Sequence, residues 1–166
     1  MMNVVRKCCL IIGIGNEFRS DDGAGLYVAR QLLKLKLPDV VVKEGSGEGT
    51  YLLHCWQGYE RVIVVDAAKS SSAPGLIHRI DTARDELPTG WSRHSSHTLG
   101  LPEAIRLAET QGSGPKSLIV YGIEGGNFQH GVTLSPEVKA AAHRLVELIV
   151  EELQSLRDAM AKMPPD

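Results

Sequence analysis

Three side chains suited to binding a divalent metal ion lie far apart in the sequence, each next to an expected strand or helix. Asp22 follows the first apolar strand, Asp66 closes the third, and His97 precedes a helix. Two carboxylates and an imidazole make a mixed oxygen and nitrogen ligand set for zinc, nickel or manganese, with a fourth position open for water or a substrate group. Such an ion polarises a peptide carbonyl or lowers the pKa of bound water toward about 7. The three residues therefore predict a metal-assisted hydrolytic site, whether the ion belongs to the protein or arrives with the substrate.

Each of these residues also has a purely structural explanation. Acids in a first helical turn, as expected for Asp21 and Asp22, stabilise the helix dipole without any further role. Asp66 can cap the loop that follows it, and a lone histidine such as His97 is often a hydrogen-bonded structural residue. His94 is expected to face solvent. Only the combination of all three at converging loops favours a site.

Five short apolar segments predict the sheet that must position these residues. Segments 8–12, 62–65 and 118–121 lack polar alternation, which is typical of central parallel strands that are covered on both faces. Segment 40–42 predicts a flanking strand, and 76–80 alternates as a half-exposed edge strand does, which we expect to be antiparallel. In an open parallel sheet, ligands bind beyond the carboxyl ends of the strands, where the winding reverses.

Helical patterns alternate with the strands, which predicts an α/β fold, a three-layer α/β/α sandwich on a mostly parallel twisted sheet of about five strands. The expected helices span 21–36, 51–57, 102–111 and 136–160, the last opened by Ser135 as N-cap and Pro136. Their expected buried residues are Leu26, Ala29, Leu32, Leu33 and Leu35 in the first, and Leu101, Ile105 and Leu107 around the third. We expect one domain over residues 1–166, with its core at about 8–156 and a flexible C-terminal tail.

Composition excludes several partners. The net charge is −2, the basic residues are scattered, and aromatic residues make up 5% of the 166 residues, so we expect no nucleic-acid partner. The apolar run at 8–12 is too short to span a bilayer and has no signal-peptide cleavage site, so we expect no membrane association and a cytoplasmic location. The three cysteines lack C-x-x-C spacing and are expected to be buried free thiols.

Other chemistries have weaker support. The turn after the first strand has Phe18 where a dinucleotide fingerprint has its third glycine, and there is no G-K-[ST] or G-x-S-x-G motif. Cys55 has no suitable base beside it. The Gly13-Ile14-Gly15-Asn16 turn also suggests a peptidyl-tRNA hydrolase, but no histidine precedes His54 and the surface is not basic.

Taken in order, these motifs resemble the hydrogenase maturation endopeptidase family over about residues 10–153. The motifs are Gly13-x-Gly15-Asn16, Asp21-Asp22-Gly23-x-Gly25, Val65-Asp66-Ala67, Ser96-His97-x-Leu99, Gly122-Ile123-Glu124 and Gly131-x-x-Leu134-Ser135-Pro136-x-Val138. The resemblance implies an endopeptidase that removes the C-terminal extension from the precursor of a nickel-iron hydrogenase large subunit, with the cut just after a basic residue.

The resemblance also assigns roles. It places Asp22, Asp66 and His97 as both the metal-contacting and the catalytic residues, and the ion as the nickel already installed in the substrate, so that no tightly bound metal is expected in the free protein, which should be a monomer. The family is nominally grouped with aspartic peptidases, but Asp21 and Asp22 should point in different directions and cannot share a proton as a pepsin-like dyad does. We therefore expect the ion, or a carboxylate beside it, to activate water.

Two positions depart from the family pattern, and one alternative function stays open. Glu44 stands where an aspartate is frequent, and Glu124 precedes Gly125 where a proline is common; both are expected at the rim of the site. The alternative is a non-catalytic nickel-sensing or chaperone module that binds the immature large subunit, because ligation and hydrolysis would need the same residues.

Overall fold

A mostly parallel sheet of five strands forms the centre of the computed structural model, which describes residues 9–88, 91 and 99–164. Its strand order is β2-β1-β3-β5-β4. The pairs β1–β2, β1–β3 and β3–β5 are parallel, while β4 runs antiparallel to β5 at one edge, as predicted. The strands are β1 (Cys9–Ile14), β2 (Val40–Gly45), β3 (Arg61–Ala68), β4 (Ile77–Asp81) and β5 (Ser117–Glu124).

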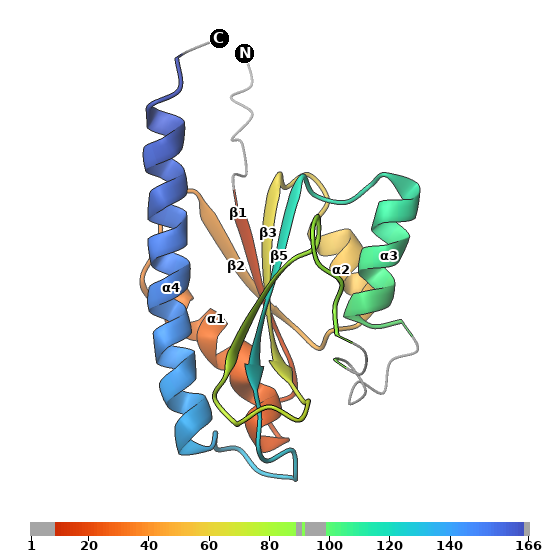
Figure 1. Cartoon of the computed structure of the whole chain (residues 1–166), viewed down its shortest axis with the longest axis vertical. Helices are drawn as coiled ribbons and strands as arrows, with labels where there is room; N and C mark the ends of the chain where they lie inside the picture. The colour runs from red at the N-terminus through yellow and green to blue at the C-terminus, as the bar shows by residue number, and fades with distance from the viewer. Residues whose placement is uncertain (1–8, 89–90, 92–98, 165–166) are drawn as a thin grey trace.

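Helices cover both faces of the sheet, which confirms the three-layer α/β/α arrangement (Figure 1). Helices α1 and α4 lie on one face, and α2 and α3 on the other. A short 3-10 turn, η1 (Ser20–Gly23), precedes α1. The helices are α1 (Ala24–Lys34), α2 (Gly49–Cys55), α3 (Leu101–Gln111) and α4 (Pro136–Ala161).

Successive residues of the central strands enter two separate cores. Leu10 and Val62 pack with Trp56 toward α2 and α3, whereas Ile11 and Ile63 pack toward α1 and α4. Because both faces are buried, these strands carry apolar residues without alternation. This double burial is the physical basis of the uninterrupted runs in the sequence.

Three leucines that were expected to be buried are exposed. Leu33 and Leu35 are 61% and 51% exposed, and Leu107 is 37% exposed. Leu33 follows the buried Leu32 by one residue and is therefore rotated about 100° away from the core face, and Leu35 lies beyond the end of α1. The apolar stripe of α1 is thus narrower than predicted.

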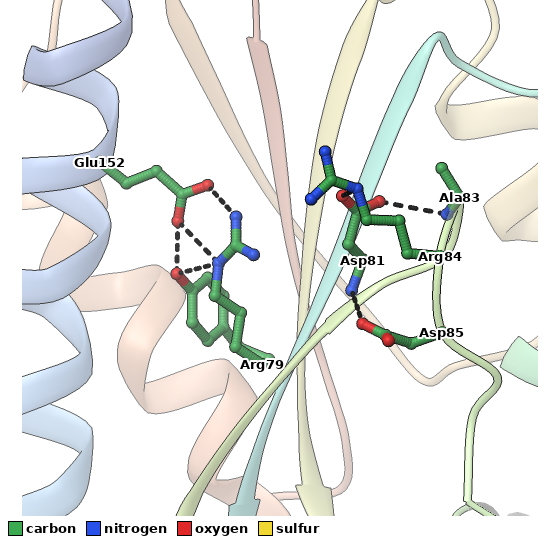
Figure 2. A network of polar contacts seen from close by, with 7 residues as sticks. Arg79, Asp81, Ala83, Arg84, Asp85 and Glu152 are labelled. Atoms are coloured by element: carbon green, nitrogen blue, oxygen red, sulfur yellow. Dashed lines mark hydrogen bonds and ion pairs between the residues drawn. The ribbon is translucent and has the colours of Figure 1, made fainter.

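A group of polar side chains, here called the clamp, connects α4 to the antiparallel edge of the sheet (Figure 2). Arg79 of β4 donates to Glu152 of α4 at 2.7 Å, and the hydroxyl of Tyr121 on β5 donates to the same carboxylate. Burial, together with this hydrogen bond to Glu152, raises the pKa of Tyr121 to about 12. The clamp joins the last helix to both strands of the antiparallel pair.

Two further predictions concern cysteines and membranes. Cys9 and Cys55 are buried free thiols, as predicted, whereas Cys8 lies outside the described residues. Along the described ranges, every helix is too short or too polar to cross a bilayer.

Candidate active site

The site lies where the winding of the sheet reverses. From β1 the chain goes to β2 on one side, and then to β3 on the other, so the loops after β1 and β3 diverge at their carboxyl ends. A cavity of about 440 Å³ opens there and contains both Asp22 and Asp66. Its lining is formed by Ile14, Gly15, Asn16, Glu17, Phe18, Arg19, Asp22, Leu26, Ser46, Gly47, Asp66, Ala67, Lys69, Trp91, Leu101 and Phe128.

Asp21 and Asp22 have different surroundings although they are adjacent. Asp21 is fully buried and accepts hydrogen bonds from the backbone N–H groups of Gly126, Asn127 and Ser135 and from the Ser135 hydroxyl, at 2.7 to 2.9 Å. Burial acts to raise its pKa, but these four hydrogen bonds outweigh it and the pKa is lowered. Asp21 is therefore an ionised structural residue that ties the loop after β5 to η1.

Asp22 faces the cavity instead. It lies in the 3-10 turn before α1, rather than in the first turn of the α-helix itself. Its Oδ2 accepts a hydrogen bond of 3.1 Å from the backbone N–H of Asn16, which closes the loop after β1. Gly15 has a φ of 147°, and a Cβ there would lie 2.0 Å from the carbonyl oxygen of Asp22. Only glycine allows this loop to pass so close to Asp22.

Asp66 enters the same cavity from β3, but it does not end the strand as predicted. Strand β3 continues to Ala68 because its pairing with β5 extends beyond Asp66, as far as the pair of Ala68 with Glu124. On the other side the pairing with β1 stops at Val65, so Asp66 is the first residue whose β1 neighbour has turned away. The carboxyl end of the paired part of β3 therefore lies at Ala68 on the β5 side and at Val65 on the β1 side.

The two cavity carboxylates interact unfavourably with each other. Burial raises the pKa of Asp66 well above its usual range, and the negative charge of Asp22 raises it further. A hydrogen bond of 2.8 Å from the Ala67 N–H only partly offsets these effects. A bound cation would relieve both the burial of charge and the mutual repulsion.

The third predicted ligand, His97, lies outside the described residues, as does His94. Trp91 and Leu101, which flank segment 92–98, both line the cavity. Within the described part of the chain, no group of three His, Cys, Asp or Glu side chains is arranged to hold a metal ion. The described residues therefore contribute two carboxylates of the predicted trio.

The two expected rim residues occupy different positions. Glu44 is exposed on β2 and pairs with Arg30 at 2.5 Å, and Arg30 also pairs at 2.9 Å with Glu17, which lines the cavity. The prediction for Glu124 is wrong: this residue is 0% exposed and lies away from the cavity lining. The reason is that β5 extends as far as Glu124, which places its side chain in the interior.

Several residues of the cavity had not been predicted. Arg19 and Phe18 belong to the loop that carries Asp22, and Lys69 comes three residues after Asp66. Phe128 reaches the cavity from the distant loop between β5 and α4. The proximity of the first three to the predicted carboxylates was a usable signal, whereas nothing local in the sequence indicated Phe128.

Comparison with known proteins connects this geometry to a family. The model of the hydrogenase maturation protease family matches residues 26–152. A relative from Methanocaldococcus jannaschii, named as a hydrogenase maturation protease, is 34% identical over 155 residues. The match covers 90% of this chain and 98% of the relative. The hydrogenase expression/formation protein HupD of Bradyrhizobium diazoefficiens is 31% identical, with 87% of this chain and 77% of the relative covered.

Solved structures of hydrogenase maturation proteases are also similar to this chain. The [NiFe] hydrogenase maturation protease HycI from Thermococcus kodakarensis superposes with a TM-score of 0.67 and 30% identity, over 89% of this chain and 93% of the other. The hydrogenase maturating endopeptidase HybD from Escherichia coli has a TM-score of 0.77 with the same coverage, and its 24% identity supports the fold alone.

Fold and site first define an α/β/α protein with acidic residues at its switch point, and the family match makes it a hydrolase. More narrowly, the chain belongs to the hydrogenase maturation protease family. Membership implies a hydrogenase large-subunit precursor as the protein on which it acts.

Proposed function

We propose that this protein is an endopeptidase that removes the C-terminal extension of a nickel-loaded [NiFe] hydrogenase large-subunit precursor. Family membership supports the reaction class. The observation that carries the proposal is the convergence of Asp22 from η1 and Asp66 from β3 on one cavity at the switch point of the sheet. The cavity is also of the size that accommodates small ligands, and so a short peptide segment.

In this proposal Asp22, Asp66 and His97 recognise the nickel that the substrate carries. Two partly buried carboxylates repel each other, so an incoming divalent ion gains from both of them. Carboxylate and imidazole are suitable ligands for nickel. A nickel-free precursor offers no such compensation and binds less well, which would restrict cleavage to metal-loaded substrate.

The same three residues would carry out the hydrolysis. Water attacks the carbonyl carbon of the scissile peptide, the C–N bond breaks, and the leaving amine takes up a proton. A carboxyl whose pKa is raised, as burial and the charge of Asp22 raise that of Asp66, is better suited to receiving and returning this proton than an ordinary carboxylate. The ion in the substrate supplies Lewis-acid polarisation of the peptide carbonyl.

The proposal has a cellular context as well. We place the protein in the cytoplasm as a monomer that uses the metal of its substrate and holds none tightly itself. The buried free thiols of Cys9 and Cys55 fit a reducing compartment. The acidic net charge fits a protein partner better than a nucleic acid.

The test is the intact mass of a nickel-loaded precursor and of its nickel-free form, each before and after incubation with the protein. Loss of a C-terminal peptide from the loaded form alone is expected, and Asp22→Ala, Asp66→Ala and His97→Ala should each abolish it. Equal cleavage of both forms would overturn metal recognition. Unchanged mass with co-elution of the two proteins would replace the endopeptidase by a non-catalytic nickel-sensing module.

A further inference from the structure

Lys69 is one of two cationic residues, with Arg19, in the lining of the cavity that Asp22 and Asp66 enter. Its Nζ lies 5.4 Å from the centroid of the Phe128 ring, and both residues line the cavity. None of the salt bridges among the described residues includes Lys69. The ammonium group is thus oriented by an aromatic face and keeps its capacity to bind an anion.

The backbone on both sides of Lys69 is fixed. The Ala68 carbonyl accepts a hydrogen bond of 2.9 Å from the N–H of Gly125. Ser70 donates its N–H and, at 3.0 Å, its hydroxyl to the buried Glu124, which also contacts His78 at 3.1 Å. A fully buried carboxylate that binds Ser70 therefore determines where the side chain of Lys69 begins.

The loop that carries Phe128 is also fixed by hydrogen bonds. Asn127, next to Phe128, donates its N–H to Asp21 at 2.8 Å, and Gln129 on the other side accepts from the Ser20 hydroxyl at 2.9 Å. A Cβ at Gly125 would lie 2.5 Å from the Phe128 ring, so the ring packs directly on that backbone. Lys69 and Phe128 consequently form a prearranged pair, which lowers the entropic cost of binding.

Each of the two segments that bring charge to the cavity carries both signs, Asp22 with Arg19 in one and Asp66 with Lys69 in the other, but the charges have different contacts. The carboxylates of Asp22 and Asp66 interact with each other, whereas Lys69 contacts the loop after β5, and Arg19 adds a second cation to the lining. Phe18 beside Arg19 is 57% exposed and offers an apolar contact. A peptide with a carboxylate would be repelled from the aspartates and attracted to the lysine, which would set the direction in which it lies.

We infer that Lys69, resting on Phe128, is a carboxylate-binding subsite for the substrate extension. This inference rests on the proposed function, and it concerns which substrate is accepted rather than how the bond is cleaved. The ligand is a carboxylate of the extension, supplied either by an aspartate or glutamate side chain or by the terminal carboxylate. Lys69 contributes a flexible point charge with three donors, which tolerates either source.

The test compares Lys69→Met, which keeps the length of the side chain and removes its charge, with Lys139→Met, the same change on the exposed surface of α4. With the nickel-loaded precursor, Lys69→Met should raise KM about five- to tenfold while kcat changes less than about twofold, as expected for one partly exposed charged contact. Lys139→Met should leave both constants unchanged. Lys69→Glu should raise KM more than Lys69→Met does. Replacing the responsible acidic side chain of the extension by lysine should lower the KM of the Lys69→Glu variant again.

Variants of the substrate identify the source of the carboxylate. Each acidic side chain of the extension is converted to its amide in turn, and a separate precursor carries a C-terminal amide. The responsible change should raise KM with the wild-type protein and have no further effect with Lys69→Met. If no change behaves in this way, the inference is overturned.

A binding measurement separates this inference from the proposed function. A fluorescein-labelled peptide that spans the scissile bond and the extension is titrated with each variant, and Lys69→Met should raise Kd about five- to tenfold. Unchanged KM and Kd would overturn the subsite while processing continues. Binding that depends on Lys69 without any cleavage would support the subsite and contradict the proposed endopeptidase function.

Discussion

Asp21 and Ser135 are 114 residues apart in the sequence and are joined by two hydrogen bonds, of 2.7 Å from the Ser135 N–H and 2.8 Å from its hydroxyl. Ser135 is the N-cap residue of α4, as predicted, but its side chain binds Asp21 and not an N–H group of the helix. The pair connects the start of α4 to the turn that presents Asp22. Of the two adjacent aspartates, one holds the loops together, and the other faces the cavity.

This division of roles predicts opposite phenotypes for matched substitutions. Asp21→Asn places an amide N–H₂ opposite donors in a buried site and should reduce the free energy of unfolding by about 2 kcal/mol, which lowers Tm by about 4–8 °C. Asp22→Asn should leave Tm within about 2 °C and abolish precursor processing. Thermal denaturation and intact mass would show this, and a stable Asp21→Asn beside an unstable Asp22→Asn would contradict it.

The lowered pKa of Asp21 predicts a specific dependence on pH. A carboxyl whose pKa is lower in the folded state stabilises the fold above its unfolded pKa of about 3.9 and loses this contribution as pH falls through the folded value. The difference in Tm between wild type and Asp21→Asn should therefore be largest near neutral pH and shrink below about pH 4. A difference that grows on acidification would be inconsistent with an ionised Asp21.

Most of the fold could be predicted because its signals are local. Apolar runs buried on both faces mark β1, β3 and β5, and alternation in β4 marks the antiparallel edge. Errors arose where tertiary context decides. Helical periodicity separates Leu33 from the buried Leu32 by about 100°, but the sequence does not reveal how wide a stripe of α1 the sheet and α4 cover, so Leu33 was predicted to be buried although it is exposed.

The site was predictable to the extent that strand ends determine it. Asp22 comes after β1 and Asp66 lies near the carboxyl end of β3; these strands are neighbours in the sheet, and the switch-point rule brings the two residues together. Glu124 could not be placed correctly because strand length depends on pairing with Ala68, which is far away in the sequence. Phe128 was missed for a similar reason, since the hydrogen bonds of Asp21 position its loop.

The close contact of α1 with the central strands depends on a glycine. A Cβ at Gly25 would lie 2.3 Å from the Val65 carbonyl oxygen and 2.4 Å from that of Ile14. Gly25→Ala should therefore force the backbone of α1 away from β1 and β3, at a cost of about 3 kcal/mol or more. Soluble yield and Tm should both fall. Gly114→Ala is the control, because its nearest neighbour would be the Ala108 Cβ at 3.5 Å, and its Tm should not change.

The clamp between α4 and the antiparallel edge should affect stability and not activity. Glu152→Gln removes the charge that Arg79 and Tyr121 share and should cost about 1 kcal/mol, which corresponds to a fall in Tm of about 2–4 °C. Processing should continue at the wild-type rate, since the clamp lies outside the cavity lining. Glu147→Gln, on the exposed side of α4, is the control and should change neither property. A loss of processing in Glu152→Gln would show that α4 influences the cavity.

The raised pKa of Asp66 predicts that the site reduces the stability of the protein. A carboxyl whose pKa is higher in the folded state binds its proton more tightly there, so stability falls as pH rises from the unfolded pKa of about 3.9 through the folded value. Asp66→Asn, which stays neutral, should therefore have a higher Tm than wild type at pH 7 to 8, and the two should converge below about pH 4. The same variant should process no precursor, because its amide cannot replace the carboxylate toward nickel. If Asp66→Asn proves less stable than wild type at neutral pH, the carboxylate makes favourable contacts that outweigh its burial and its repulsion by Asp22, and the strain attributed to the pair is absent.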